Sequence, residues 1–395
     1  MAQRVSFFSR DMIGIMIATF FYQFSIQAIN PLINGYARNL GVNSALTGII
    51  VGVMSITSML LRPFAGNLTD RVSKYQLAFI GGVLCAISDL GYLWSTNATE
   101  LLFARMINGV GFVLCTVCLA TWLAFLVPRQ HVGKAMGYYG LLNAVAMAIA
   151  PAIAISLYQH LGYRFILILA AISAVAMIIV IQFIGNQAKP QASIMTVQHF
   201  KVVQRDALPA AIIISLLSIP YFTTLADIVM YVETLKLNVT VGLFFVAYSV
   251  ILFAIRIILK DYFDKIAFGI WFYICLLATI AYIILLTIMK NNVEMILAAG
   301  MMAVGFGIMV SICESTALLL APITEQGLAN STYFLGIDIG MALGPILGGA
   351  IPAFLPLKLL YPIMLTIVPL VLIIYVFNRH KLNSAVQYNP GLLEK

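Results

Sequence analysis

Apolar residues fill most of the chain in twelve long runs, which short polar stretches separate. Each run is long enough for a helix of about 20 residues, the length that crosses the hydrocarbon core of a bilayer. One longer polar and basic stretch, 186–206, follows the sixth run. The pattern predicts an all-α integral membrane protein with twelve transmembrane helices, at about 12–36, 44–65, 77–97, 101–127, 135–158, 163–185, 207–233, 238–258, 267–289, 295–321, 331–352 and 359–378.

Composition excludes several classes of protein. Hydrophobic residues make up 62% of the 395 residues and charged residues 9%, against about 25% charged residues in soluble domains. A water-soluble fold cannot bury that much apolar surface, so a soluble enzyme and a disordered chain are excluded. The net charge of +8 does not indicate nucleic-acid binding, because the basic residues follow the predicted membrane topology.

The distribution of lysine and arginine predicts the orientation in the membrane. With the amino terminus inside, the inner segments hold 14 of these residues and the outer loops five. Cytoplasmic loops are enriched in both, so we expect a multi-pass protein of the cell (plasma) membrane with both termini in the cytoplasm. The first run is too long for the core of a signal peptide and has no clear cleavage site, so we interpret it as the first helix.

The cysteines and histidines give no sign of a metal or redox centre. All five cysteines fall within predicted helices, and all four histidines fall in loops or tails. Cys115 and Cys118 have the spacing of a redox or metal pair, but small packing residues are the more common reading in an apolar helix. We expect no disulfide, no metal and no cofactor, and no nucleophile–base pair indicates an enzyme.

The two halves of the chain resemble each other at a constant offset of 194 residues. Duplicated six-helix bundles are typical of transporters whose substrate site lies near the bilayer midplane, at the interface of the repeats. The sequence therefore predicts bundles at 1–185 and 207–395, a cytoplasmic linker at 186–206, and a short cytoplasmic tail. The matching pairs are Arg62 and Arg256, Asp70 and Asp264, Gly111 and Gly305, Pro128 and Pro322, and Pro151 and Pro345.

A motif follows the second predicted helix, from Arg62 through Gly66-Asn-Leu-Thr-Asp70-Arg71-Val-Ser-Lys74. It resembles G-x-L-x-D-R-x-G-R-K of the major facilitator superfamily, with Ser73 in place of the second glycine. In that family the loop latches the two bundles together in the outward-open state. The resemblance implies the same latch here, in which Asp70 pairs with a base or caps a neighbouring helix end.

A weaker copy of this motif runs from Arg256 to Asp264-Lys265. Lys260 replaces its glycine, so the resemblance implies a looser latch in the second half.

Two further motifs support the resemblance. Leu101-x-x-x-Arg105-x-x-Asn108-Gly109-x-Gly111 resembles a motif of the fourth helix that contributes to proton transfer in proton-coupled members. The eleventh helix has Gly340-x-x-x-Gly344-Pro345-x-x-Gly348-Gly349, which resembles the motif that marks the fifth helix in the antiporter branch. The fifth helix itself has alanines around Pro151. The resemblance implies gating roles for Pro151, Gly344 and Pro345, because small residues allow close helix approach and proline bends a helix.

Polar side chains recur at helical spacing in the first helix. Gln23, Gln27, Asn30 and Asn34 are three or four residues apart, so they share one face, and Asn30 precedes Pro31, where we expect a bend. Such amides either hold helices together or line a wet cavity, and four on one stripe favour the cavity. We assign substrate binding to these four and to polar and aromatic residues of the helices that line or border the cavity in this family: Arg105, Asn108, Phe112, Tyr139, Asn143, Tyr221 and Thr224.

Four carboxylates lie within the apolar runs. A carboxylate in hydrocarbon binds and releases protons near neutral pH, which is the chemistry of proton coupling. We assign this role to Asp227, Glu314 and Asp338, for each of which a structural pairing is the alternative. The third helix is usually peripheral in this family, so we interpret Asp89 as structural.

The sequence as a whole indicates a proton-coupled exporter of drugs or metabolites that works by alternating access, similar to the bacterial drug/proton antiporters. Its expected partners are a small-molecule substrate, protons and the lipid bilayer, and we expect a monomer that binds no nucleic acid. One alternative is a dedicated exporter of one endogenous polar metabolite, such as a siderophore or metallophore. Another is a lipid flippase of the same fold, and an importer stays open because coupling energetics set the direction.

Overall fold

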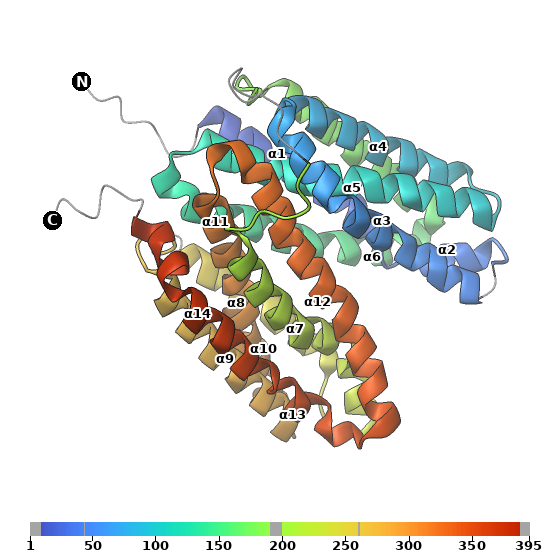
Figure 1. The fold of residues 1–395 in the computed structure, drawn as a ribbon. Helices are drawn as coiled ribbons and strands as arrows, with labels where there is room; N and C mark the ends of the chain where they lie inside the picture. Colours follow the sequence, from blue (N-terminus) through green and yellow to red (C-terminus); the bar gives the residue numbers. More distant parts are fainter. Residues whose placement is uncertain (1–8, 43, 190–199, 260, 388–395) are drawn as a thin grey trace. The chain divides into compact units, whose positions relative to one another are not determined.

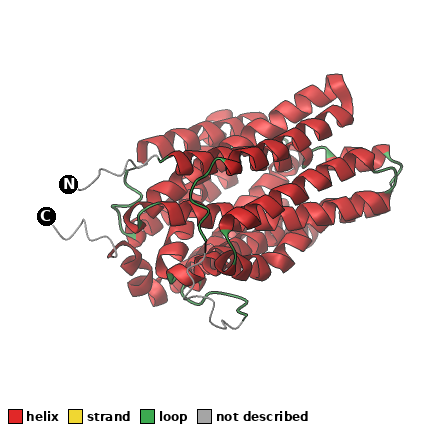
Figure 2. Cartoon of the chain, turned by 90° about the horizontal axis from the view of Figure 1, so that it is seen from above, coloured by secondary structure: helices red, strands yellow, loops and turns green. Residues whose placement is uncertain are grey.

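The computed structural model describes residues 9–42, 44–189, 200–259 and 261–387. Over these ranges the chain forms helices joined by loops, without a strand (Figure 2). The described ranges contain 12 helices that are long and apolar enough to cross a membrane, which confirms the predicted fold class. Part of the linker predicted at 186–206 lies outside the described residues, and so does Lys260.

The first half of the chain contributes α1 to α6 (Figure 1). Pro31 has no N–H and interrupts the first predicted helix, as expected from its sequence. Gly162, with φ 75°, separates two membrane spans inside α6, and only glycine adopts this conformation without strain. The helices are α1 (Arg10–Ile29), α2 (Ile33–Asn39), α3 (Ser44–Arg71), α4 (Lys74–Trp94), α5 (Ala98–Leu126) and α6 (Val132–Gln182).

The second half contributes α7 to α14 (Figure 1). The tenth predicted helix is interrupted by a π-helical turn, η3 (Ala303–Ile308), which the hydrophobic pattern does not indicate. The last helix extends beyond the predicted end at 378. The helices are α7 (Leu208–Thr234), α8 (Val241–Leu259), α9 (Phe268–Ile288), α10 (Asn292–Met302), α11 (Met309–Leu320), α12 (Gln326–Phe354), α13 (Leu360–Met364) and α14 (Ile367–Gln387).

Several helix boundaries follow the offset of 194 residues. Adding it to the bounds of α4, Lys74–Trp94, gives those of α9, Phe268–Ile288. The same shift relates Asn97 and Asn291, whose side chains accept from backbone N–H groups at the starts of α5 and α10. Each asparagine satisfies donors that have no partner within the helix. The repeat therefore exists in the structure as well as in the sequence.

The chain divides into two compact units. The first contains residues 1–128, 142–203 and 323–331, and the second contains 129–141, 204–322 and 332–395. Two short segments, 129–141 and 323–331, thus belong to the unit that is built mainly from the other half of the chain. We call them the exchanged segments, and each includes the start of a long helix, α6 or α12.

In the first unit, α5 packs against α1, α3 and α4. Two glycines of α5 allow this close contact. A Cβ at Gly109 would lie 2.7 Å from the carbonyl oxygen of Met54 in α3, and one at Gly111 would lie 2.7 Å from Sγ of Cys85 in α4. These glycines belong to the motif at the start of the fourth membrane helix, so the motif serves packing at both positions.

In the second unit, α12 packs against α7 through a row of glycines at positions 340, 344 and 348. The glycines are four residues apart and therefore share one face. A Cβ at Gly344 would lie 2.8 Å from Cβ of Phe222, and the carbonyl oxygen of Gly344 accepts a hydrogen bond from Thr223 Oγ1 at 2.9 Å. The equivalent positions on α6 are the buried alanines 146, 150 and 154, and two of these pack in a core cluster with Phe24 and Ala28 of α1.

Replacing Gly340 with alanine is expected to lower the thermal unfolding midpoint of the purified protein. The new methyl group would lie 2.2 Å from Cβ of Ser218 and 2.7 Å from the carbonyl oxygen of Ser215, both in α7. Overpacking of this kind costs about 1–3 kcal/mol. Gly349→Ala is the matched control, because a Cβ there meets nothing within 4 Å. Equal midpoints for the two variants would contradict the close packing of α7 and α12.

Candidate functional site

Arg105 is the centre of a buried polar cluster in the first unit. Its side chain is 3% exposed. Both terminal guanidinium nitrogens donate to Oδ1 of Asn30, at 3.3 and 3.4 Å, and the group also donates to the carbonyl oxygens of Ile50 and Val51 in α3. Asn30 in turn donates from Nδ2 to Oε1 of Gln27 at 3.1 Å. Arg105 therefore connects α5 with α3 and with the end of α1.

The four amides of the first predicted helix differ in exposure. Gln23 is buried, and its Oε1 has no hydrogen-bond partner among the described residues. Gln27 and Asn30 are half-buried, whereas Asn34 is exposed. Because α1 ends at Ile29, Asn30 lies at the break and Asn34 lies in α2. The amides thus lead from the interior of the unit to its accessible surface.

Asn108 and Phe112 of α5 lie in different surroundings. Asn108 is buried and donates from Nδ2 to Oγ of Ser88 in α4 at 2.7 Å, so it holds two helices together. Phe112 is half-buried, and its ring lies 5.5 Å from Cζ of Arg62, a cation–π contact. Arg62 is 1% exposed and donates from Nη1 to Oγ1 of Thr116 at 2.8 Å.

Arg256 of α8 is the counterpart of Arg62 in the second unit. It is buried and donates from Nη2 to the carbonyl oxygen of Gly307 at 2.7 Å, and from Nη1 to that of Gly137 at 3.4 Å. Gly307 belongs to the π-turn η3, where the helical bonding pattern is interrupted and a carbonyl can accept an outside donor. A Cβ at Gly140 would lie 2.1 Å from Nη1 of Arg256, so the guanidinium occupies the space that a side chain there would need.

Glu314 lies near this arginine without forming an ion pair. Its side chain is 2% exposed, and Arg256 is within electrostatic reach. In the described ranges, Oε1 of Glu314 and Oγ of Ser311 have no hydrogen-bond partner, and no cation lies within 4.0 Å of the carboxylate. Ser311 and Glu314 are three residues apart on one face of α11. The cluster therefore holds a buried cation, a buried carboxylate and unused hydrogen-bonding capacity.

Aromatic rings lie next to this cluster. Tyr221 stacks on Phe306 with ring centroids 3.9 Å apart and an interplanar angle of 17°. The ring centroid of Tyr221 lies 5.8 Å from that of Tyr248 and 5.0 Å from that of Phe222. Tyr139, from an exchanged segment, is 1% exposed. We call Tyr221, Phe222, Tyr248 and Phe306 the aromatic wall. Arg256 is within electrostatic reach of two of its members, Tyr221 and Tyr248.

The remaining predicted residues of the second unit occupy varied positions. Asp227 is half-buried, and its Oδ2 faces Gly348 of α12 so closely that a Cβ there would lie 1.7 Å from it. That oxygen has no hydrogen-bond partner within the described part of the chain. Thr224 is buried and donates to the carbonyl oxygen of Pro220 at 2.8 Å, and Asp338 is 5% exposed. In the first unit, Asn143 is half-buried and Pro151 lies inside α6.

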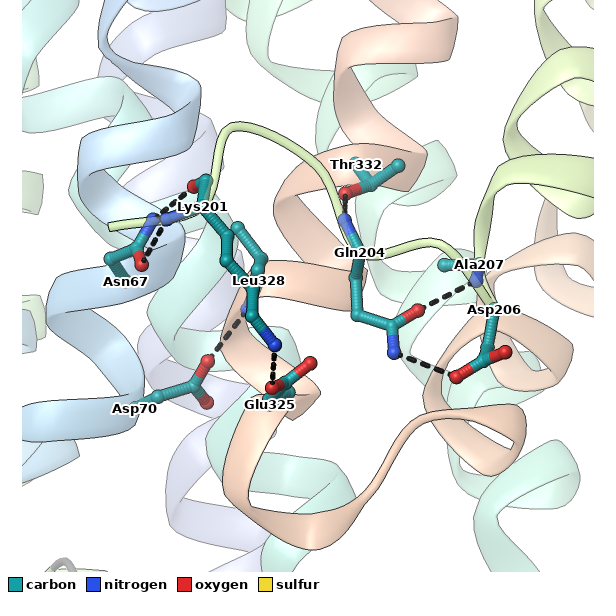
Figure 3. A network of polar contacts seen from close by, with 9 residues as sticks. All are labelled: Asn67, Asp70, Lys201, Gln204, Asp206, Ala207, Glu325, Leu328 and Thr332. Atoms are coloured by element: carbon teal, nitrogen blue, oxygen red, sulfur yellow. Dashed lines mark hydrogen bonds and ion pairs between the residues drawn. The ribbon is translucent and has the colours of Figure 1, made fainter. Parts of the chain in front are cut away.

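Asp70 caps the start of α12 in the first unit. Its Oδ2 accepts from the backbone N–H of Leu328 at 2.9 Å (Figure 3). Its Oδ1 accepts from the backbone N–H of Gly327 at 2.6 Å. The first N–H groups of a helix lack partners within the helix, and the helix dipole favours a negative charge there. Gly66 is essential for this approach, since a Cβ would lie 2.5 Å from Cβ of Ser331. Of the two predicted outcomes for Asp70, a base or a helix end, the structure shows the helix end.

Other residues of the motif and the linker support this contact. Lys201 forms an ion pair with Glu325, and Asn67 donates from Nδ2 to the backbone carbonyl of Lys201 at 2.6 Å (Figure 3). Lys74 is 7% exposed and donates to the carbonyl oxygen of Thr69 at 3.4 Å, whereas Arg71 is exposed.

In the second unit, Gln204 fixes the end of the linker before α7. Its backbone N–H donates to Thr332 Oγ1 at 2.9 Å, and its Oε1 accepts from the N–H of Ala207 at 2.8 Å (Figure 3). Gln204 was not among the residues predicted from the sequence.

Asp264 makes the equivalent contact in the second unit. Its Oδ1 accepts from the backbone N–H of Lys134 at 2.8 Å, at the start of α6, and Lys134 forms an ion pair with Asp261. Burial raises the pKa of the Asp264 carboxyl, while the N–H of Lys134 and the nearby His131 oppose this rise. Leu328 and Lys134 are also 194 residues apart, so each repeat caps the fifth helix of the other. The weaker motif copy thus keeps a capping bond from a backbone N–H at the start of the helix.

Two charged residues were given no functional role by the sequence analysis. Arg256 was noted only as the repeat partner of Arg62 and as the start of the weaker motif copy, although an arginine inside an apolar run is itself a functional signal. Asp89 was interpreted as structural, but it is 0% exposed and within electrostatic reach of Arg105. Within the described residues, no group of three or more His, Cys, Asp or Glu side chains could hold a metal ion.

The comparisons with known proteins agree with this arrangement. The family model of the Major Facilitator Superfamily matches residues 15–322. The quinolone resistance protein NorA of Staphylococcus aureus (strain COL) is 22% identical over 339 residues, covering 82% of this chain and 86% of that protein. A multi-drug resistance efflux pump PmrA homologue of Lactococcus lactis subsp. lactis (strain IL1403) is 23% identical over 177 residues, covering 44% of this chain and 42% of that protein.

Solved structures show the same fold. A bacterial homologue of the iron transporter ferroportin, in an outward-facing state, has a TM-score of 0.75 at 14% identity and covers 93% of this chain and 99% of its own. The human organic anion transporter MFSD10 has a TM-score of 0.70 at 14% identity, with the same coverage. Since the family model matches most of the chain and the twelve helices form this fold, the protein is a membrane transporter of the major facilitator superfamily, not an enzyme.

Proposed function

We propose that this transporter exports small molecules in exchange for protons, by alternating access across the cell (plasma) membrane, with both termini in the cytoplasm. The observation that carries the proposal is Glu314. It is a buried carboxylate with an unused oxygen, in reach of Arg256 but not paired with it. A carboxylate that only stabilised the fold would be expected to hold its cation directly, because an unpaired buried charge is costly.

Proton binding at Glu314 changes the charge of the cluster. The proton forms one O–H bond at a carboxylate oxygen and removes one negative charge beside Arg256. A cationic substrate and a proton then compete for the same carboxylate, which is how antiport couples two gradients. Asp227 and Asp338 are further candidates for proton binding, since both are withdrawn from solvent. A proton gradient supplies about 1.4 kcal/mol per pH unit, and the membrane potential adds about 2.3 kcal/mol per charge per 100 mV.

The aromatic wall of the second unit supports the proposal that the substrates are apolar or cationic. Tyr221, Phe306 and Tyr248 offer flat faces next to the charged cluster. Such rings bind apolar groups of many shapes and attract cations through their faces. The names of the relatives, a quinolone resistance protein and a multi-drug resistance efflux pump homologue, point to the same substrate class.

The capping bonds of Asp70 and Asp264 suit a latch. Each carboxylate holds the first turn of a long helix through backbone N–H groups. Capping at a helix start contributes about 0.3–2 kcal/mol, which is enough to bias a conformational equilibrium and small enough to be broken in each cycle. We assign Gly66, Arg71 and Lys74 to the same latch, and bending and close packing to Pro151, Gly344 and Pro345.

A second candidate function is the export of one endogenous polar metabolite, such as a siderophore or metallophore. The polar cluster of the first unit favours it, since Arg105, Asn30 and Gln27 present a cation and amides to a polar or anionic ligand. A panel of substrates separates the two candidates.

The test is proton movement in vesicles that contain the reconstituted protein and a pH-sensitive dye. Addition of ethidium or a fluoroquinolone is expected to move protons in the wild type. The rate should fall about 5–150-fold in Glu314→Gln, the usual range when a coupling free energy is lost. Glu100→Gln is the matched control, because this exposed carboxylate caps the start of α5 and should leave the rate unchanged. Binding of these compounds without any proton movement would overturn the antiport proposal.

Asp70→Asn tests the latch. The neutral amide keeps one acceptor but loses the charge and the second oxygen that hold the start of α12, so transport should slow by about 2–30-fold. Binding of ethidium, followed by fluorescence anisotropy, should stay within twofold of the wild type, since Asp70 is not among the proposed substrate-binding residues. Weaker binding with an unchanged turnover rate would show that Asp70 does not act as a latch.

A further inference from the structure

Asp89 is a fully buried carboxylate in the interior of the first unit. It lies in α4 and is 0% exposed. Its Oδ2 accepts a hydrogen bond from Oγ of Ser25 in α1 at 2.7 Å. Its Oδ1 has no hydrogen-bond partner among the residues that the structure describes. One oxygen of a buried acid is therefore available for a proton.

The groups that face Asp89 come from three helices. Ser25 approaches from α1, and Arg105 from α5 is the cation within electrostatic reach. Tyr92, on the same helix as Asp89, is the titratable neighbour and is also fully buried. In the described ranges no cation lies within 4.0 Å of the carboxylate. Arg105 instead uses its guanidinium for long bonds to Asn30 and to backbone carbonyls of α3.

The second repeat shows that the fold does not need this acid. The residue 194 positions after Asp89 is Ile283, which is 0% exposed at the matching place on α9. The positions that match Ser25, Arg105 and Asn108 are also apolar and buried: Ile219, Ala299 and Met302. An apolar residue thus fills the same place in the same helix arrangement. A buried acid that packing does not require, and that weakens the interior when charged, indicates a function.

We propose that Asp89 binds and releases a proton in the transport cycle and passes this change to Arg105. The inference rests on the proposed proton-coupled function. The observed arrangement, with Arg105 bonded to Asn30, is the one that a neutral carboxyl group allows. Loss of the proton breaks one O–H bond and leaves a negative charge in reach of the guanidinium. Arg105 then moves from the amide oxygen of Asn30 to Asp89, because a charge-assisted bond is stronger than one to a neutral amide.

The exposure of the amides supports a route by which a proton reaches Asp89 and by which its binding affects the neighbouring helices. Asn34 is exposed, Asn30 and Gln27 are half-buried, and Arg105 and Asp89 are buried. Hydrogen bonds join the half-buried Gln27 and Asn30 to the buried Arg105, and Arg105 is within electrostatic reach of the acid. Because Arg105 contacts both α1 and α3, its movement changes how these helices are held to α5. Asp89 is in this sense a positioning residue, since it acts through Arg105 and not by contact with the substrate.

The test is infrared spectroscopy of the full chain reconstituted in lipid vesicles. Difference spectra between neutral and acidic pH are expected to contain the carbonyl-stretch band of a protonated carboxylic acid. Asp89→Asn should remove one component of this band, and Glu100→Gln, an exposed acid at the start of α5, should keep that component. Ethidium added at constant pH should change this component in the wild type. Identical spectra for the wild type and Asp89→Asn would overturn the inference.

Two further measurements keep the test decisive. Ser25→Ala keeps the acid and removes its hydrogen bond, so the frequency of the same component should shift even if Asp89→Asn does not fold. An unchanged frequency would show that the component does not belong to Asp89.

If the component behaves as expected but the wild type moves no protons with substrate, the antiport proposal fails and the protonation site stands. If protons move and Asp89→Asn leaves the band unchanged, only this inference fails.

Discussion

The cost of a charge in an apolar interior governs this structure. Every ionic or polar group inside the helices must be paired, hydrated or neutralised by a proton, since the surrounding side chains and lipid offer no compensation. Arg62 meets this demand with a threonine and an aromatic ring, and Arg256 meets it with carbonyl groups of its neighbours. Asp89, Asp227 and Glu314 each keep an oxygen without a hydrogen-bond partner in the described part of the chain. These three acids are where binding of a proton changes the energy of the interior most.

The π-turn η3 shows how the backbone takes part in this compensation. An interior carbonyl of a regular helix already accepts one backbone hydrogen bond, so a carbonyl where that pattern is interrupted has more capacity to accept from a buried guanidinium. Interruption of the regular pattern at 303–308 lets the carbonyl of Gly307 accept from Arg256. The absence of a side chain at Gly140 provides the space that the guanidinium occupies, and Gly307 supplies the carbonyl that accepts from it. The arginine, the two glycines and the turn are therefore one structural feature, and a change in any of them affects the others.

Much of the fold could be predicted because it depends on local patterns. The lengths of the apolar runs predict twelve helices, Pro31 predicts the break after α1, and the constant offset predicts the repeat. The π-turn could not be predicted, since its sequence is as apolar as that of the flanking helices. The exchanged segments depend on contacts between residues more than 100 positions apart, such as Asp70 and Leu328, which no local pattern encodes. The structural interpretation of Asp89 came from the usual peripheral place of its helix, whereas its own side chain points into the core.

The repeats share a scaffold but distribute their chemistry differently. In the first unit Ser25, Asp89, Arg105 and Asn108 lie on α1, α4 and α5, and the residues 194 positions after them are apolar. In the second unit the acid Glu314 lies on α11 beside Arg256, and the residue 194 positions before Glu314 is the buried Ala120. What the repeats keep in common is packing: glycines or alanines at the same places, asparagine caps, and an aspartate at the start of the fifth helix of the other repeat. Residues that serve packing and capping thus recur in both halves, while those with buried charge chemistry occur mostly in one. A buried polar residue whose repeat counterpart is apolar is for this reason a better indicator of function than burial or charge alone, and Asp89, Arg105 and Glu314 all meet this criterion.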